Sequence, residues 1–189
     1  MIACQPDGKE YESEEAYKKG IETLETLLED GKPDYKKAQE HFAQATHLNP
    51  KNVTAQFWKA DAELKLGKFE ESLETSITAL KKSEFKHRLR PHILGIAGIS
   101  AKKIGKSGDG YFSEAIAIYE KRMKGDINNV DAIANKAILL CYMDKKGDAI
   151  AFLNTLSLNE ENQAFVEQIK IDIQTFDADE VLNQLKIEK

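Results

Sequence analysis

Small and large apolar residues recur at helical spacing in four segments of the chain. When these segments are aligned, the small residues that coincide are Ala38, Ser72, Ala115 and Ala149. The intervals between them are 34, 43 and 34 residues, and each segment follows another stretch with helical periodicity. Helical hairpins that repeat at this period cannot bury their apolar faces alone, so they stack on one another. The pattern predicts an all-α solenoid of four helix-turn-helix units.

Two of the segments carry a more specific resemblance. The stretches "AQEHFAQATHLNP" (38–50) and "KADAELKLGKFEESL" (59–73) match the spacing of the tetratricopeptide repeat consensus. The chain therefore resembles the tetratricopeptide repeat (TPR) family over residues 12–158, which implies four TPR-like repeats. The small residues that this resemblance assigns to the close contact between the two helices of a unit are Ala60, Gly98 and Ala137.

Three residues depart from the repeat pattern. Gln56 stands where an aromatic side chain is usual, Ser76 replaces a large apolar residue, and Arg122 replaces an alanine. We expect these departures to weaken individual repeats rather than to change the fold.

The repeat period stops after residue 158. Phe165, Ile169 and Ile173 then fall on one face of a further helix, and Asp177 or Asp179 is a natural N-cap for the last one. Residues 159–189 are therefore predicted to form a C-terminal helical cap over the open apolar end of the array. A regulatory or dimerising tail is the alternative, since exposed apolar ends also mediate association.

The glycine-rich stretch "GKSGDG" (105–110) invites comparison with a phosphate-binding loop. That loop needs a glycine five residues before its Gly-Lys pair and a strand ahead of it. Here the position is Ser100, and the preceding segment has helical periodicity. Because the interval of 43 exceeds 34 by nine residues, five of which are 106–110, we expect a long helix–helix turn.

No residues with catalytic or metal-ligating spacing occur in the sequence. The four histidines are His41, His47, His87 and His92, and none forms an HExxH motif or the short spacings of a zinc site. No nucleophile, base and orienting group can be assembled. The chain is therefore predicted to be no enzyme, with no catalytic residue, metal ligand or cofactor.

The resemblance implies a binding groove on the concave side of the superhelix, which the first helix of each TPR unit lines. The residues that it places there are Phe57, Trp58, Asp61 and Lys65 from the second unit, His92, Ile96, Ile99 and Lys103 from the third, and Asn135, Ile138 and Tyr142 from the fourth. Aromatic residues give large contact areas at low entropic cost, so Trp58 beside Phe57 suits a binding hot spot. The alternative for Trp58 is packing between adjacent first helices.

Charge is distributed unevenly along the chain. Residues 51–130 carry 15 basic and 10 acidic side chains, a balance of +5, whereas residues 1–50 and 131–189 each have a balance of −5. The positive middle predicts attraction of an acidic partner, with a mixed solvated surface as the alternative. The net charge of −5 argues against nucleic acid as the main partner. We expect a protein or peptide partner with apolar anchors and acidic flanks.

The stretch "MIACQPDGKEYES" raises the question of membrane anchoring. Ile-Ala-Cys resembles the end of a bacterial lipoprotein signal, in which a small residue precedes the lipidated cysteine. On this interpretation Cys4 is a lipidation site, residues 1–11 are a polar tether, and the protein is anchored in the bacterial cell envelope and faces the periplasm. The charged and apolar segments of a signal peptide are missing from the sequence, and the cytoplasm is the alternative location.

Taken together, these features predict a non-catalytic protein–protein interaction module, an adaptor or assembly factor that binds a partner segment in the groove. Two alternatives stay open. One is a dedicated inhibitor or immunity protein that neutralises a toxin or enzyme, and the other is a structural homo-oligomer.

Overall fold

The computed structural model describes residues 8–83 and 87–184, and within them the chain forms ten helices and no strand longer than an isolated bridge. The helices are α1 (Gly8–Glu25), α2 (Tyr35–Leu48), α3 (Val53–Lys65), α4 (Phe69–Lys82), α5 (Arg90–Lys103), α6 (Asp109–Gly125), α7 (Val130–Tyr142), α8 (Lys146–Asn154), α9 (Glu160–Thr175) and α10 (Ala178–Gln184). The all-α class predicted from the repeat period is confirmed.

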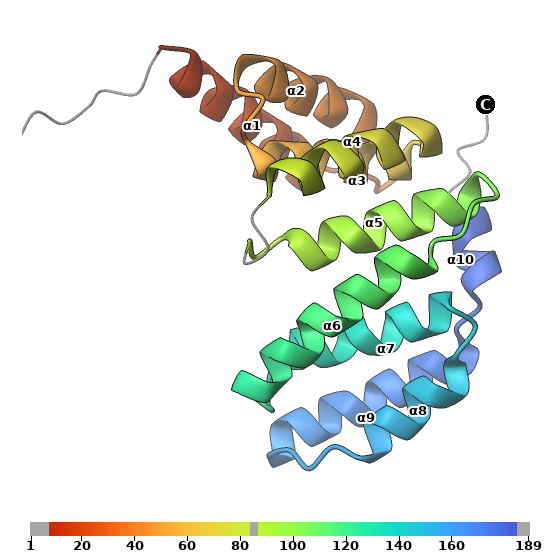
Figure 1. Ribbon diagram of the computed structural model, residues 1–189. Helices are drawn as coiled ribbons and strands as arrows, with labels where there is room; N and C mark the ends of the chain where they lie inside the picture. The colour runs from red at the N-terminus through yellow and green to blue at the C-terminus, as the bar shows by residue number, and fades with distance from the viewer. Residues whose placement is uncertain (1–7, 84–86, 185–189) are drawn as a thin grey trace, which may run out of the picture.

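The helices pack as successive antiparallel hairpins. Each helix from α1 to α8 contacts the next one along the chain, and additional contacts join α3 to α5 and α7 to α9. Figure 1 shows the resulting stack, which runs from α1 and α2 at one end to α8 and α9 at the other. Among the first helices of the units, α3 and α5 are therefore in direct contact, and α7 follows on the other side of α6 along the chain.

Side-chain caps fix where several helices begin. Asn52 and Asn129 accept hydrogen bonds of 2.9 Å from the backbone amides of Ala55 and Ala132, at the starts of α3 and α7. Such bonds satisfy amides that have no partner inside the helix. Of the two caps predicted for the last helix, Asp177 serves, since its carboxylate accepts from the amides of residues 179 and 180.

The turn between the two helices of a unit is built the same way in the second, third and fourth units. Gly67, Gly105 and Asp144 each follow the last turn of a first helix with a φ of 69°, 74° and 60°. In each case the next amide bonds to the carbonyl five residues back, as Lys106 does to Ala101 at 2.9 Å. This is the usual left-handed end of a helix, for which glycine is suited.

The structure corrects the expected extent of the turn at 105–110. Helix α6 already begins at Asp109, so only part of the extra length is turn, and the rest lengthens α6 to 17 residues against 14 in α4. The chain at Gly108 lies against α5, where a Cβ atom would come within 2.3 Å of the Gly98 carbonyl oxygen. The turn is a close helix–helix contact rather than a projecting loop.

One boundary predicted at the N-terminal end and one buried face predicted at the C-terminal end also need correction. Residues 8–11, expected in the N-terminal tether, belong to α1, whereas Cys4 lies outside the described residues. In the predicted C-terminal cap, α9 buries Val166, Ile169 and Ile173, while Phe165 is 45% exposed. The buried Val166, Ile169 and Ile173 are spaced by three and four residues, which is close to the 3.6-residue turn of a helix. The expected set, which had Phe165 in place of Val166, is spaced by four residues twice.

The largest apolar core lies in the C-terminal half of the array. It joins α5 through α9 and includes the buried Phe112, Tyr119, Ile133, Leu153 and Val166. The first two units have only small apolar clusters, one of which consists of three buried alanines. The two halves of the array are therefore held together by different amounts of apolar contact.

Candidate protein-binding groove

Helices α3, α5 and α7 line one pocket of about 280 Å³, which we call the groove. Its lining residues are Phe57, Asp61, Leu64 and Lys65 from α3, Pro91, His92, Gly95, Ile96 and Ile99 from α5, Tyr119 from α6, and Asn135, Ile138, Leu139 and Tyr142 from α7. Side chains of all three first helices thus meet at one pocket.

Nine of the eleven residues predicted for the groove line this pocket. They are Phe57, Asp61, Lys65, His92, Ile96, Ile99, Asn135, Ile138 and Tyr142. Sequence reasoning missed Tyr119, because this residue belongs to a second helix and only first helices were considered. The spacing rule also gave no signal for Gly95, whose lack of a side chain leaves part of the pocket open.

Trp58 does not line the groove. Its indole stacks on the fully buried Phe42 of α2, with ring centroids 6.3 Å apart and planes 20° apart. Its other neighbour is Phe57, at 5.1 Å and in an edge-on arrangement. These ring contacts thus place Trp58 against α2, the second helix of the preceding unit, rather than in the groove or between adjacent first helices.

Lys103, the other predicted residue outside the pocket, lies at the C-terminal end of α5. Its ammonium sits over the ring of Phe69 in α4, 5.0 Å from the centroid. The neighbouring Lys102 donates to the Tyr142 carbonyl at 2.6 Å and pairs with Asp144 at 3.3 Å. The lysines of this segment therefore lie beside the groove, at the end where α7 stops.

A histidine and a tyrosine form the polar centre of the groove. The His92 Nδ1 atom and the Tyr119 hydroxyl are hydrogen bonded at 3.2 Å, and Phe57 meets the imidazole edge-on at 6.4 Å. Burial lowers the pKa of His92, an effect that the charge of Asp131 opposes and that of Arg122 reinforces. Burial likewise raises the pKa of Tyr119. Both groups are therefore neutral at physiological pH, so they offer hydrogen bonds without charge.

Asp61 and Lys65 supply the ionisable pair of the groove. Burial raises the pKa of Asp61, and the nearby charge of Lys65 partly offsets this effect. The apolar part of the surface comes from Phe57, Ile96 and Ile138, the last of which is 40% exposed. An apolar surface with a few placed polar groups is typical of a binding site.

The C-terminal segment contacts one residue of the groove, Tyr142. Tyr142, the last residue of α7, stacks on Phe112 at 6.0 Å and meets Phe176 edge-on at 5.4 Å. Phe176 lies two residues before the start of α10, which Figure 1 shows at the side of the array. Residues after the fourth unit thus support a groove side chain as well as covering the apolar end.

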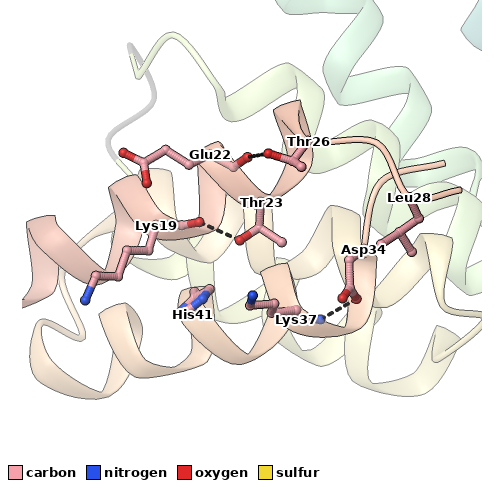
Figure 2. A pocket seen from close by; sticks show the side chains of 8 residues that line it. All are labelled: Lys19, Glu22, Thr23, Thr26, Leu28, Asp34, Lys37 and His41. Carbon is pink, nitrogen blue, oxygen red and sulfur yellow. Dashed lines mark hydrogen bonds between the residues drawn. The ribbon is translucent and has the colours of Figure 1, made fainter. Parts of the chain in front are cut away.

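A larger pocket, of about 430 Å³, lies between the end of α1 and the start of α2 (Figure 2). Three of its polar side chains bond locally: the Thr23 and Thr26 hydroxyls donate to carbonyls one turn back in α1, and Asp34 caps α2. In Figure 2 the Lys19 and Glu22 side chains extend away from the hydroxyls. This pocket has no converging set of polar groups, so we favour the groove as the functional site.

The described part of the chain lacks the features of a metal site and of a membrane-spanning helix. Residues 8–83 and 87–184 contain no group of three or more His, Cys, Asp or Glu side chains that could hold a metal ion. Among the helices in these ranges, none combines the length and the apolar character needed to cross a bilayer.

Comparisons with known proteins agree with this architecture. Residues 14–83 match the model of the family described as tetratricopeptide repeat. A thermophilic TPR protein of Thermus thermophilus has a similar structure, with a TM-score of 0.57 and 16% sequence identity over 92% of this chain and 90% of that one. No curated protein matches the chain. Residues 14–83, which span the first two units, thus match the tetratricopeptide repeat family, and the array as a whole has the all-α solenoid fold of the solved TPR protein.

Proposed function

We propose that this protein binds a segment of a partner protein in the groove formed by α3, α5 and α7. The tetratricopeptide repeat fold suggests a protein–protein interaction module, and the family is generally one of non-catalytic scaffolds. The observation that carries the proposal is the convergence of apolar and neutral polar side chains from three units on one pocket of about 280 Å³.

The chemistry of the groove indicates the chemistry of the segment. Apolar side chains of the partner would pack against Phe57, Ile96 and Ile138, and these contacts would supply most of the affinity. Backbone groups of the partner would bond to the neutral His92 and to Asn135. Acidic residues flanking the anchors would be attracted by the basic segment 51–130, which chiefly raises the association rate.

A charge placed in the groove tests this proposal. Ile138 is 40% exposed in the groove, and Ile171 is 57% exposed on α9, outside it. Ile138→Glu and Ile171→Glu therefore introduce the same charge at two exposed isoleucines. Partners captured by the wild-type protein and identified by mass spectrometry should be lost with Ile138→Glu and retained with Ile171→Glu. Retention of every partner by Ile138→Glu would move the binding site out of the groove.

A further inference from the structure

A second pocket, of about 370 Å³, lies on a different face of α3, between α2, α3 and α4. It is lined by Thr46, Gln56, Lys59, Glu63, Glu71, Glu74, Thr75, Thr78 and Lys82, and it shares no residue with the groove. Every one of these side chains is polar or charged. We call this site the polar pocket.

Two deeply buried side chains in the polar pocket have atoms without a hydrogen-bond partner. Among the described residues, the buried side-chain atoms that lack a partner are Gln56 Oε1, Glu63 Oε2 and Ser76 Oγ. The first two belong to the lining of the pocket, where Glu63 is 2% exposed and Gln56 is 4% exposed. Such atoms are rare in folded proteins, because losing water without gaining a new bond is unfavourable.

The contacts of their neighbouring atoms explain why these oxygens are left over. Gln56 Nε2 donates to the Pro50 carbonyl at 2.7 Å, and turning the amide round would set two acceptors against each other. Glu63 Oε1 pairs with Lys59 Nζ at 3.3 Å, whereas Oε2 is buried and has no partner. Both unpartnered atoms are therefore acceptors, and a donor from outside the chain would satisfy them.

The cations of the polar pocket are already engaged with the protein. Lys59 Nζ donates to Thr75 Oγ1 at 3.3 Å in addition to its pair with Glu63, and Lys82 Nζ donates to the Pro50 carbonyl at 2.7 Å. Against these two lysines stand three carboxylates, those of Glu63, Glu71 and Glu74. The polar pocket therefore has acceptors without donors, and its three carboxylates outnumber its two lysines.

We propose that the polar pocket binds a guanidinium group. A guanidinium carries five N–H donors in one plane, so it can donate to Glu63 Oε2 and Gln56 Oε1 at once and turn its outer edge toward the carboxylates of Glu71 or Glu74. The volume far exceeds the roughly 30 Å³ that one water molecule occupies, so an organic group has room. A bare metal ion suits the site less, because two lysines line it. The group belongs either to an arginine of a protein or to a free guanidino compound.

Calorimetric titration of the full chain with matched probes tests the proposal. N-acetyl-arginine amide presents the side chain as a protein does, and N-acetyl-citrulline amide has nearly the same shape without the charge. We expect saturable one-to-one binding of the arginine probe, and binding of the citrulline probe at least tenfold weaker. Agmatine, titrated in parallel, represents the free compound: the tighter of agmatine and the arginine probe identifies the source.

Variants locate the site and separate it from the groove. Glu63→Gln keeps the shape of the side chain but removes its charge, and it should weaken the arginine probe at least tenfold. Glu70→Gln makes the same change on an exposed residue of α4 that does not line the pocket, and binding should stay within twofold. Ile138→Glu in the groove should also leave binding unchanged, so this test does not depend on the groove.

Three outcomes would overturn the proposal. The first is that the arginine probe shows no saturable binding, which is expected if water fills the pocket. The second is that the citrulline probe binds the wild-type protein as tightly as the arginine probe does. The third is that Glu63→Gln binds the arginine probe with full affinity. If Glu63→Gln does not fold, as judged by circular dichroism, the exposed rim variant Glu74→Gln replaces it. That variant should weaken binding at least threefold, and unchanged affinity would equally contradict the proposal.

Discussion

The closest helix–helix contact in the third unit can be tested with one methyl group. A Cβ atom built at Gly98 would come within 2.3, 2.6 and 2.8 Å of three ring atoms of Phe112, which is fully buried. Cβ contacts under 3.0 Å are essentially never seen, so either the ring or the helix must move. Gly95, one turn earlier in the same helix, provides the control, because a Cβ there would meet only Leu139 at an ordinary 3.7 Å.

Two terms set the expected magnitude. Replacing glycine by alanine inside a helix stabilises it by about 0.8–1.0 kcal/mol, and this gain is common to both variants. Forcing extra volume into a packed core costs about 1–3 kcal/mol, and three contacts well under 3.0 Å place Gly98 toward the upper end. Gly98→Ala should therefore lose about 1–2 kcal/mol of unfolding free energy, whereas Gly95→Ala should gain up to about 1 kcal/mol.

Urea unfolding followed by far-ultraviolet circular dichroism measures both variants under the same conditions. The difference in unfolding free energy between them should be about 2–3 kcal/mol, with Gly98→Ala unfolding at the lower urea concentration. The fluorescence of Trp58, the sole tryptophan, gives an independent signal from the second unit. If Gly98→Ala proves as stable as Gly95→Ala, the two helices are not packed as closely as the distances indicate.

Three further predictions concern charged and titratable side chains. Asp61→Asn should raise the melting temperature at pH 7. Burial raises the pKa of Asp61, so the protonated side chain stabilises the folded state below pH 3.8, and this contribution is lost as the pH rises through the folded-state pKa. Asparagine stays uncharged at pH 7 and so avoids this loss. The gain should disappear in melts below pH 3.8, and a gain that persists there would show that ionisation is not its cause. Burial lowers the pKa of His92, so the unfolded chain takes up the proton first and stability falls as the pH drops below 6.5. His92→Gln should flatten the melting-temperature profile in that range, and an unchanged slope would contradict the assignment. The double variant Lys59→Met, Glu63→Leu replaces the ion pair of the polar pocket by apolar residues, and it should raise the unfolding free energy measured in urea by about 1–4 kcal/mol. Marked destabilisation would show that the pair holds the unit together.

The architecture was predictable from the sequence because it depends on a repeating pattern. Small residues recur in the same structural place of each unit, at Ala38, Ser72, Ala115 and Ala149. All four are fully buried. Alignment along a common period also carries residues to a common face, so most of the predicted groove residues line one pocket. Periodicity reports which helix face a residue occupies, and that is enough to predict a groove.

Periodicity does not report what a side chain touches beyond its own helix. Trp58 falls on the expected helix, but its ring leans on Phe42 of the preceding unit. Lys103 is long enough to lie over Phe69, and Tyr119 enters the groove from a second helix. Each of these placements depends on the distance between units, which one sequence does not contain.

The second unit shows the same distinction most sharply. A sequence comparison finds Gln56 and Ser76 where large apolar residues are usual, and the simplest interpretation is a weakened repeat. The structure adds that Gln56, Lys59 and Glu63 occupy one face of α3 and line one pocket. A poorly packed apolar core and a polar site have the same sequence pattern, since both are departures from apolar residues. They differ in hydrogen bonding: a weakened core leaves voids, whereas here two acceptors are buried without donors beside a partly engaged ion pair. Folding alone disfavours such atoms, and the guanidinium group proposed for the polar pocket would give both of them a donor.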